Sequence, residues 1–178
     1  MPDSKSTIAE LVDAATAHAA DFPGTRPVIP ARHLAIVACM DSRLDVFRIF
    51  GLREGDAHII RNAGGLVTDD AIRSLSASQR LLGTEEIVVV MHDGCGLCGA
   101  SEDDFAQALA ADGVLPTWRL GAFKDVEDTL RHSLTRLRSS PELPAREHIS
   151  GFVFDPETGA LREVHASPVD TAAAVSDQ

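Results

Sequence analysis

The segment "EEIVVVMHDGCGLCGA", residues 85–100, combines a strongly predicted strand with several reactive side chains. Residues 85–92 are rich in β-branched apolar residues and predict a buried strand. His92 ends this strand, and a glycine-rich turn with Cys95 and Cys98 follows it. Three kinds of site fit such a turn: a dinucleotide-binding loop, a redox-active cysteine pair and a metal centre.

The dinucleotide interpretation rests on Gly94, Gly96 and Gly99, which match Gly-x-Gly-x-x-Gly between a strand and a helix. That fold also needs an acidic residue at the end of a second strand about 20 residues further on, to hold a ribose. Residues 112–118, "DGVLPTW", instead indicate a helix end and a loop. The sequence therefore disfavours this interpretation.

The redox interpretation uses Cys95 and Cys98 at the start of a predicted helix, where the helix dipole lowers the pKa of a thiol. It gives no role to His92 or to Cys39 earlier in the chain. We expect Cys98 to be a small buried residue that packs near the site.

Strands alternate with helices along the chain. Predicted helices cover 6–20, 44–50, 69–82, 101–113 and 123–137, and predicted strands cover 33–39 and 85–92. Residues 57–65 predict a strand that runs into a glycine-containing loop, and 150–165 predict a hairpin. This order predicts an α/β fold with a largely parallel sheet flanked by helices and a C-terminal antiparallel hairpin. We expect residues 1–165 to form a single domain and 166–178 to be a flexible tail.

The metal interpretation uses more of the sequence. Cys39 ends one predicted strand and His92 ends another, 53 positions later. Sites in open α/β sheets form beyond the carboxyl ends of the strands, so the two side chains can meet there. With Cys95 they offer zinc three ligands and leave a fourth position open, as in catalytic sites. A structural zinc site would need Cys98 as a fourth ligand, which we consider a minor alternative.

Asp41 and Arg43 follow Cys39 on the same loop. Two thiolates already neutralise Zn²⁺, so the metal-bound water would be harder to ionise than one held by neutral ligands. Asp41 could accept a hydrogen bond from zinc-bound hydroxide and orient it. Arg43 would keep that carboxylate ionised and away from the open metal position.

At these residues the sequence resembles the β-class carbonic anhydrases, whose signature is Cys-x-Asp-x-Arg followed later by His-x-x-Cys. Here the signature stands as Cys39, Asp41 and Arg43, then His92 and Cys95. The likeness extends to "IIRNAGG" at 59–65 and covers about 35–99, and the length fits the small, compact branch of the family.

The resemblance implies a zinc enzyme that hydrates CO₂ to bicarbonate and a proton by a zinc-bound hydroxide. Cys39, His92 and Cys95 would bind Zn²⁺, with Asp41 and Arg43 as the catalytic dyad. Asp41 would itself ligate the metal only in a closed, inactive state. The resemblance also implies a homodimer or a dimer of dimers, with the helix in residues 1–30 as an arm over a neighbouring subunit.

Two features depart from the family pattern. Asp93-Gly94 stands where the family often has Thr-Asp or Thr-Gly, and Cys98 is an addition. Because related members hydrolyse carbonyl sulfide or carbon disulfide with the same ligands, these substrates stay open as an alternative. A non-catalytic zinc-binding or nucleotide-binding module is the alternative from another functional class.

Composition limits the partners. Lys and Arg total 16 against 27 Asp and Glu, a net charge of −11, which disfavours nucleic-acid binding. We find no apolar run long enough for a membrane span and no secretory pattern in "MPDSKSTIAE", so we expect a cytoplasmic protein without membrane contact. Trp118 is expected to be a packing residue. Arg61 and Asn62 are equally consistent with shaping the metal loop and with a structural turn.

Overall fold

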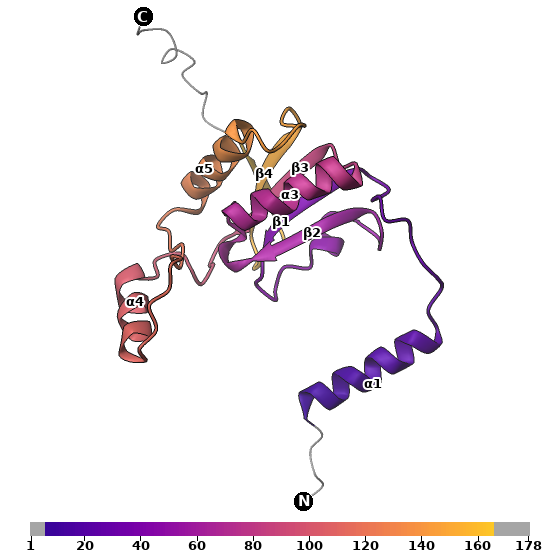
Figure 1. Cartoon of the computed structure of the whole chain (residues 1–178), viewed down its shortest axis with the longest axis horizontal. Helices are drawn as coiled ribbons and strands as arrows, with labels where there is room; N and C mark the ends of the chain where they lie inside the picture. Colours follow the sequence, from indigo (N-terminus) through magenta and orange to yellow (C-terminus); the bar gives the residue numbers. More distant parts are fainter. Residues whose placement is uncertain (1–5, 166–178) are drawn as a thin grey trace, which may run out of the picture.

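One mixed sheet with the strand order β2-β1-β3-β4-β5 lies at the centre of the computed structural model, which describes residues 6–165 (Figure 1). The strands are β1 (Leu34–Cys39), β2 (Ala57–Asn62), β3 (Glu86–His92), β4 (Ile149–Phe154) and β5 (Leu161–Val164). The first four run parallel, and β5 pairs antiparallel with β4. The predicted α/β fold and its C-terminal hairpin are confirmed; the predicted tail at 166–178 lies outside the described residues.

Residues 6–165 also form five α-helices and one short 3₁₀ helix; α1 precedes β1, and the others lie between strands. They are α1 (Thr7–Ala20), α2 (Val46–Ile49), η1 (Ala63–Gly65), α3 (Asp69–Leu82), α4 (Glu102–Ala111) and α5 (Val126–Ser139). The boundaries of α3 follow directly from the sequence. The Thr68 hydroxyl accepts a hydrogen bond from the Ala71 amide at 3.2 Å, and Gly83 ends the helix with a φ of 68°.

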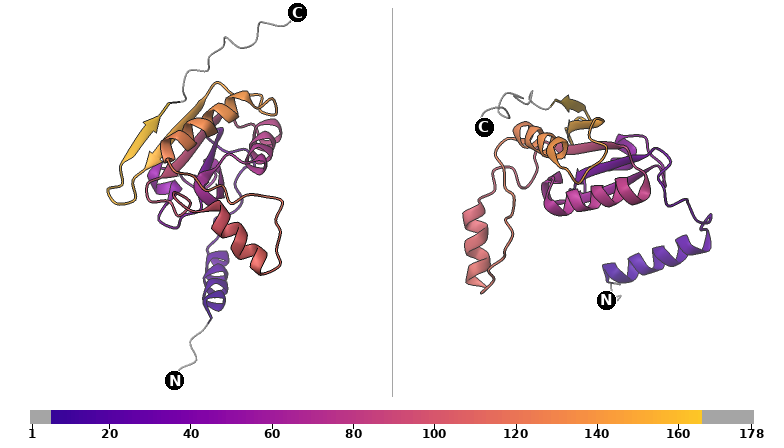
Figure 2. Two further views of the ribbon diagram at one scale, coloured as in Figure 1. Left: turned by 90° about the vertical axis from the view of Figure 1, so that its left-hand side faces the viewer. Right: turned by 45° about the horizontal axis from the view of Figure 1, so that its top comes forward.

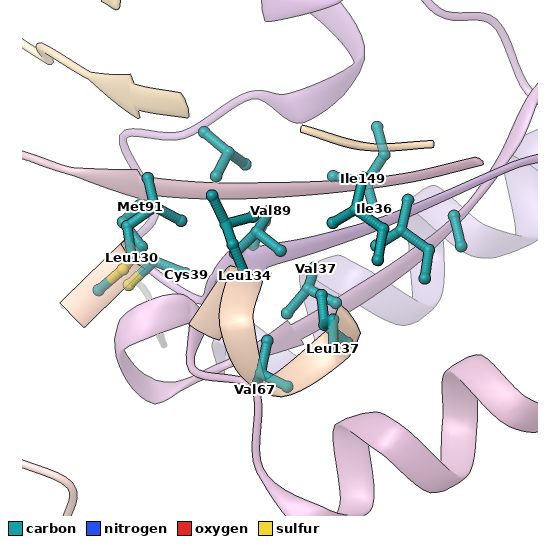
Figure 3. Packing of buried hydrophobic residues seen from close by; sticks show 14 of the residues in the cluster. Ile36, Val37, Cys39, Val67, Val89, Met91, Leu130, Leu134, Leu137 and Ile149 are labelled. Atoms are coloured by element: carbon teal, nitrogen blue, oxygen red, sulfur yellow. The ribbon is translucent and has the colours of Figure 1, made fainter. Parts of the chain in front are cut away.

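The main core lies between the sheet and helices α3 and α5, which lie side by side against it (Figures 1 and 2). Leucines of α5 point into the sheet and contact its β-branched and sulfur-containing residues. Figure 3 shows Leu130, Leu134 and Leu137 of α5 beside Met91, Val89 and Val37 of the sheet. Each of these side chains is at most 1% exposed. This close packing fixes the central strands just before the carboxyl ends at which the site forms.

Helices α1 and α4 stand away from this core (Figures 1 and 2). Neither helix contains a buried residue. Trp118, which follows α4 and was expected to be a packing residue, lies outside the core at 59% exposure, with its ring centroid 6.3 Å from that of Phe105 in α4. No helix within residues 6–165 has the length and apolar content needed to cross a membrane. The single domain predicted for 1–165 stays a prediction.

Gly65 ties the loop after β2 to the two central strands. Its φ of +66° lies in the left-handed region, which favours glycine. A Cβ atom at this position would lie 2.8 Å from the Cys39 amide nitrogen and 2.9 Å from the Val90 carbonyl oxygen. Both neighbours are backbone atoms of paired strands, so they cannot move aside without disturbing the sheet, and only glycine fits here.

We expect Gly65→Ala to lower the free energy of unfolding by about 1–3 kcal/mol more than Gly159→Ala does. Gly159 is the matched control because its φ is also positive, at +77°, but its added Cβ would meet nothing within 4 Å. Urea denaturation of the two variants measures the difference. Equal losses would show that the approach of Gly65 to β1 and β3 does not constrain the fold.

Candidate metal centre

Three potential metal ligands meet at the carboxyl ends of β1 and β3. Cys39 is the last residue of β1, His92 is the last residue of β3, and Cys95 lies on the turn that follows. Because β1 and β3 are parallel neighbours, both strands end at the same edge of the sheet. The three side chains are buried, and their ligand atoms all lie within 4.8 Å of one another. The structure thus brings together the three residues that the sequence singled out.

The turn after β3 reverses direction so that Cys95 returns toward His92. Gly94 has a φ of +63°, and the Cys98 amide donates to the Cys95 carbonyl at 3.0 Å. Cys98 itself is exposed, so the prediction of a small buried residue is wrong. Its thiol points to the Lys124 carbonyl, 3.6 Å away, and it is not in the group of three ligands.

His92 has one ring nitrogen satisfied and one without a partner. Nδ1 lies 2.9 Å from the Asp93 carbonyl oxygen. A carbonyl oxygen can only accept, so Nδ1 carries a proton, and in the neutral ring Nε2 presents a lone pair. Nε2 is buried and has no hydrogen-bond partner among residues 6–165. Such an unpaired buried atom costs about 1–3 kcal/mol, which a metal ion at this point would offset.

The two buried thiols differ in acidity. Burial raises the pKa of the Cys39 thiol, but the neighbouring His92 imidazole and nearby backbone amides outweigh burial and lower that pKa to about 7. Burial also raises the pKa of Cys95, and the adjacent Cys39 sulfur, 3.9 Å away, raises it further. One thiolate therefore forms readily, while the second needs a cation to stabilise it.

Asp41 and Arg43 form a fork-like ion pair beside the three ligands. Arg43 donates from its backbone amide and Nε to Asp41 Oδ1, both at 2.9 Å, and from Nη2 to Oδ2 at 2.8 Å. This pairing holds the pKa of the Asp41 carboxyl well below its usual range. Asp41 Oδ2 is also 3.7 Å from Nε2 of His92. The carboxylate is thus ionised, close to the candidate metal position and turned toward Arg43.

Arginines also connect the loops of the site. Nη2 of Arg43 donates to the Gly94 carbonyl at 3.0 Å, which links the Cys39 loop to the Cys95 turn. Arg61 donates to the Cys39 carbonyl from Nε at 3.0 Å and from Nη2 at 2.7 Å, and to the Asp41 carbonyl at 2.7 Å. Asn62 instead closes its own turn onto Leu66. Arg61 therefore supports the site loop and Asn62 supports the structural turn.

Arg162 contacts Asp93, beside the ligand His92, and the sequence did not predict this contact. Its guanidinium binds the Asp93 carboxylate with two hydrogen bonds and lowers the pKa of that carboxyl. The two residues lie 69 positions apart, and only the sheet topology brings them together. An arginine in a hairpin strand has no local feature that would identify this contact.

Apolar side chains gather next to the ligands around Gly64. A Cβ atom on Gly64 would lie 3.1–3.4 Å from atoms of Leu97, Leu66 and Phe123. The Gly64 amide is also among the backbone groups that lower the pKa of Cys39. An apolar wall thus borders the polar metal-binding position.

Comparison with known proteins places this chain in a family. Residues 34–161 match the family model described as "Carbonic anhydrase". Over 148 residues the chain is 49% identical to "Beta-carbonic anhydrase 1" of Mycobacterium tuberculosis, covering 83% of this chain and 91% of that protein. The chain therefore belongs to the β-carbonic anhydrases, which are metalloenzymes, and the predicted family and enzyme class are confirmed.

Two further relatives bear on fold and substrate. The crystal structure of a carbonic anhydrase from Streptococcus mutans aligns with a TM-score of 0.83 and 40% identity, covering 91% of this chain and 99% of that one. A "Carbon disulfide hydrolase" of Acidithiobacillus thiooxidans is 39% identical over 155 residues, covering 75% of this chain and 78% of that protein.

Proposed function

We propose that this protein hydrates CO₂ to bicarbonate and a proton in a zinc-dependent reaction, with Cys39, His92 and Cys95 as the metal ligands. The observation that carries the proposal is the buried Cys-His-Cys group, whose ligand atoms lie within 4.8 Å of one another and include an unpaired Nε2. Membership of the β-carbonic anhydrase family supports the same reaction.

The donor set suits zinc in type and in spacing. Thiolate sulfur and imidazole nitrogen are the ligands that zinc prefers. A tetrahedral ion with Zn–S bonds of about 2.3 Å places two sulfurs about 3.8 Å apart. The sulfurs of Cys39 and Cys95 are 3.9 Å apart, so their spacing already suits a shared ion. Three protein ligands leave one position for solvent, as a catalytic site requires.

Zn²⁺, when bound here, would lower the pKa of a coordinated water and so supply a nucleophile at neutral pH. Asp41 would accept a hydrogen bond from that nucleophile and orient it. Arg43 holds the Asp41 carboxylate ionised, with its Oδ2 3.7 Å from Nε2 of His92. The apolar wall of Leu66, Leu97 and Phe123 would receive a small uncharged substrate.

Hydrolysis of carbonyl sulfide or carbon disulfide is the second candidate. The 39% identity to a carbon disulfide hydrolase favours it, because that relative covers most of this chain. Both substrates are linear and weakly polar like CO₂, so the same apolar wall would accept them. Proton release from CO₂ and sulfide release from carbonyl sulfide or carbon disulfide, measured on one preparation, separate the two functions.

We expect the purified protein to contain about one zinc ion per chain and to hydrate CO₂ in a stopped-flow assay until a chelator removes the metal. Cys39→Ser should lose most of the zinc and of the activity, because it removes one of three ligands. Cys98→Ser is the matched control and should keep both, since this thiol is exposed. A wild-type protein without zinc, or equal metal loss in both variants, would contradict the proposed site.

We expect Asp41→Ala to keep its zinc and to lose turnover by about 10- to 100-fold, because the nucleophile would no longer be oriented. Stopped-flow CO₂ hydration and metal analysis of the same sample measure the two effects. Asp45→Ala serves as a control, since Asp45 caps α2 on the same loop. Full activity in Asp41→Ala would exclude the orienting role.

We further propose that the protein is a homodimer or a dimer of dimers that covers the projecting helices. Apolar residues of α1 are strongly exposed: Ile8 is 73%, Leu11 64% and Val12 58% exposed. A groove of about 410 Å³ between α4 and residues 114–120 is also open and is bordered by Trp118. Such unpartnered apolar surfaces are typical of interfaces. Cytoplasmic residence stays a prediction.

We expect Leu11→Glu to shift the protein toward smaller species in sedimentation velocity, because a charge in the apolar stripe of α1 opposes burial. Ala17→Glu, on the opposite side of the helix, should leave the distribution unchanged. A wild type that sediments as a monomer at micromolar concentration would refute the assembly.

A further inference from the structure

Asp93 occupies the position between the ligand His92 and the turn glycine, and all of its polar groups are engaged. Its amide donates to the Phe154 carbonyl of β4 at 3.0 Å. Its carbonyl accepts the Nδ1 proton of His92 at 2.9 Å. Its carboxylate receives two hydrogen bonds from Arg162, at 2.5 and 2.9 Å. The residue that selects the histidine tautomer is therefore itself held from two neighbouring strands.

Arg162 is placed for this contact by the antiparallel hairpin. It lies on β5 opposite Val153, while β4 runs beside β3 and aligns Phe154 with His92. The planar guanidinium meets both oxygens of Asp93 in a fork, which fixes direction as well as distance. Its Nε donates to Glu127 of α5 at 3.1 Å, so a second carboxylate holds the side chain in place.

Asp93 alone connects Arg162 to His92, so loss of the Arg162 contact can affect the metal site. Rotation of the Asp93 backbone would move its carbonyl oxygen and free the Nδ1 proton of His92. The imidazole could then turn or exchange tautomers, and Nε2 would no longer aim at the space between the two thiols. Groups that orient a metal-binding histidine commonly change metal affinity or activity by about 10- to 100-fold when removed.

We propose that Arg162 is a positioning residue of the metal centre, acting through the carboxylate and backbone of Asp93 on the orientation of His92. The inference rests on the proposed function, because it assigns His92 to the metal. It also gives a role to the Asp93 carboxylate, which would otherwise have no part in the site. The contact couples the C-terminal hairpin and α5 to a ligand on the central strand.

The test compares Arg162→Gln with Arg131→Gln in the full-length protein. Arg131 also pairs with Glu127, and with Asp128, so the control removes an arginine from the same cluster without touching Asp93. Competition with a chromophoric chelator should show zinc held about 10-fold less tightly in Arg162→Gln and within 2-fold of wild type in Arg131→Gln. Arg162→Lys, which keeps the charge but loses the fork, should fall between them. Equal affinity in wild type and Arg162→Gln would overturn the proposal.

A double-mutant cycle with Asp93→Asn distinguishes positioning from loss of stability. If Arg162 acts through Asp93, the double variant should bind zinc no more weakly than Arg162→Gln alone. Independent, multiplying losses in the two single variants would overturn the proposal. Thermal unfolding of each variant shows whether a weaker site merely follows a less stable fold, and an affinity loss that tracks unfolding across all variants would also overturn it.

Nitrogen-15 NMR of the imidazole groups gives a readout that needs no activity. In zinc-loaded wild type we expect His92 in the tautomer with the proton on Nδ1 and slow exchange of that proton. Arg162→Gln should exchange the proton about 10-fold faster, while Arg131→Gln should match wild type. A wild type that binds no zinc would refute the proposed function, whereas an unchanged His92 signal in Arg162→Gln would refute the positioning role alone.

Discussion

The parallel pairing of β1 with β3 is the constraint on which the whole site depends. The register aligns Leu34 with Glu86 and Ala38 with Val90, so the two strands reach the same edge of the sheet together. One residue of slip moves a strand end by about 3.3 Å, which nearly equals the 3.9 Å between the two ligand sulfurs. A shared metal position therefore exists in one register only. The buried core behind the strands fixes that register, because a slip would carry apolar side chains out of it.

Three arginine guanidinium groups hold the loops at the carboxyl edge of the sheet in place. Arg43 joins its own loop to the turn of the next strand, Arg61 gathers two carbonyls of the Cys39 loop, and Arg162 reaches across the hairpin. A guanidinium supplies several donors in a fixed plane, so one side chain can hold two acceptors at once. A lysine would supply the charge without the direction. The precision of the site thus comes from planar donors around a rigid sheet edge.

Much of this arrangement was predictable because it is local or follows from general rules. The caps of α3, the strand that ends at His92 and the ligand spacing are all encoded within short windows of sequence. The meeting of Cys39 and His92 followed from the rule that sites form at the carboxyl ends of parallel strands. Membership of the family was visible from five residues in order.

The remainder depends on tertiary placement that no short window contains. Arg162 meets Asp93 only because β4 and β5 add to the sheet beyond β3. The exposure of Cys98 depends on which way the turn faces after it pairs with Phe123. Whether Trp118 packs inside or lies on the surface depends on α4 leaving the body of the protein, and its apolar character alone does not decide between them.

The segment of residues 99–123, which contains α4, begins and ends at nearly the same point. The Gly99 amide donates to the Phe123 carbonyl at 2.7 Å, and the Phe123 amide donates to the Leu97 carbonyl at 3.1 Å. Glu102 closes the returning chain by accepting from the amides of residues 120–122. The residues between these hydrogen bonds therefore form an insert whose two ends are fixed next to each other. A change in the length of this insert therefore need not displace the strand ends that carry the candidate ligands.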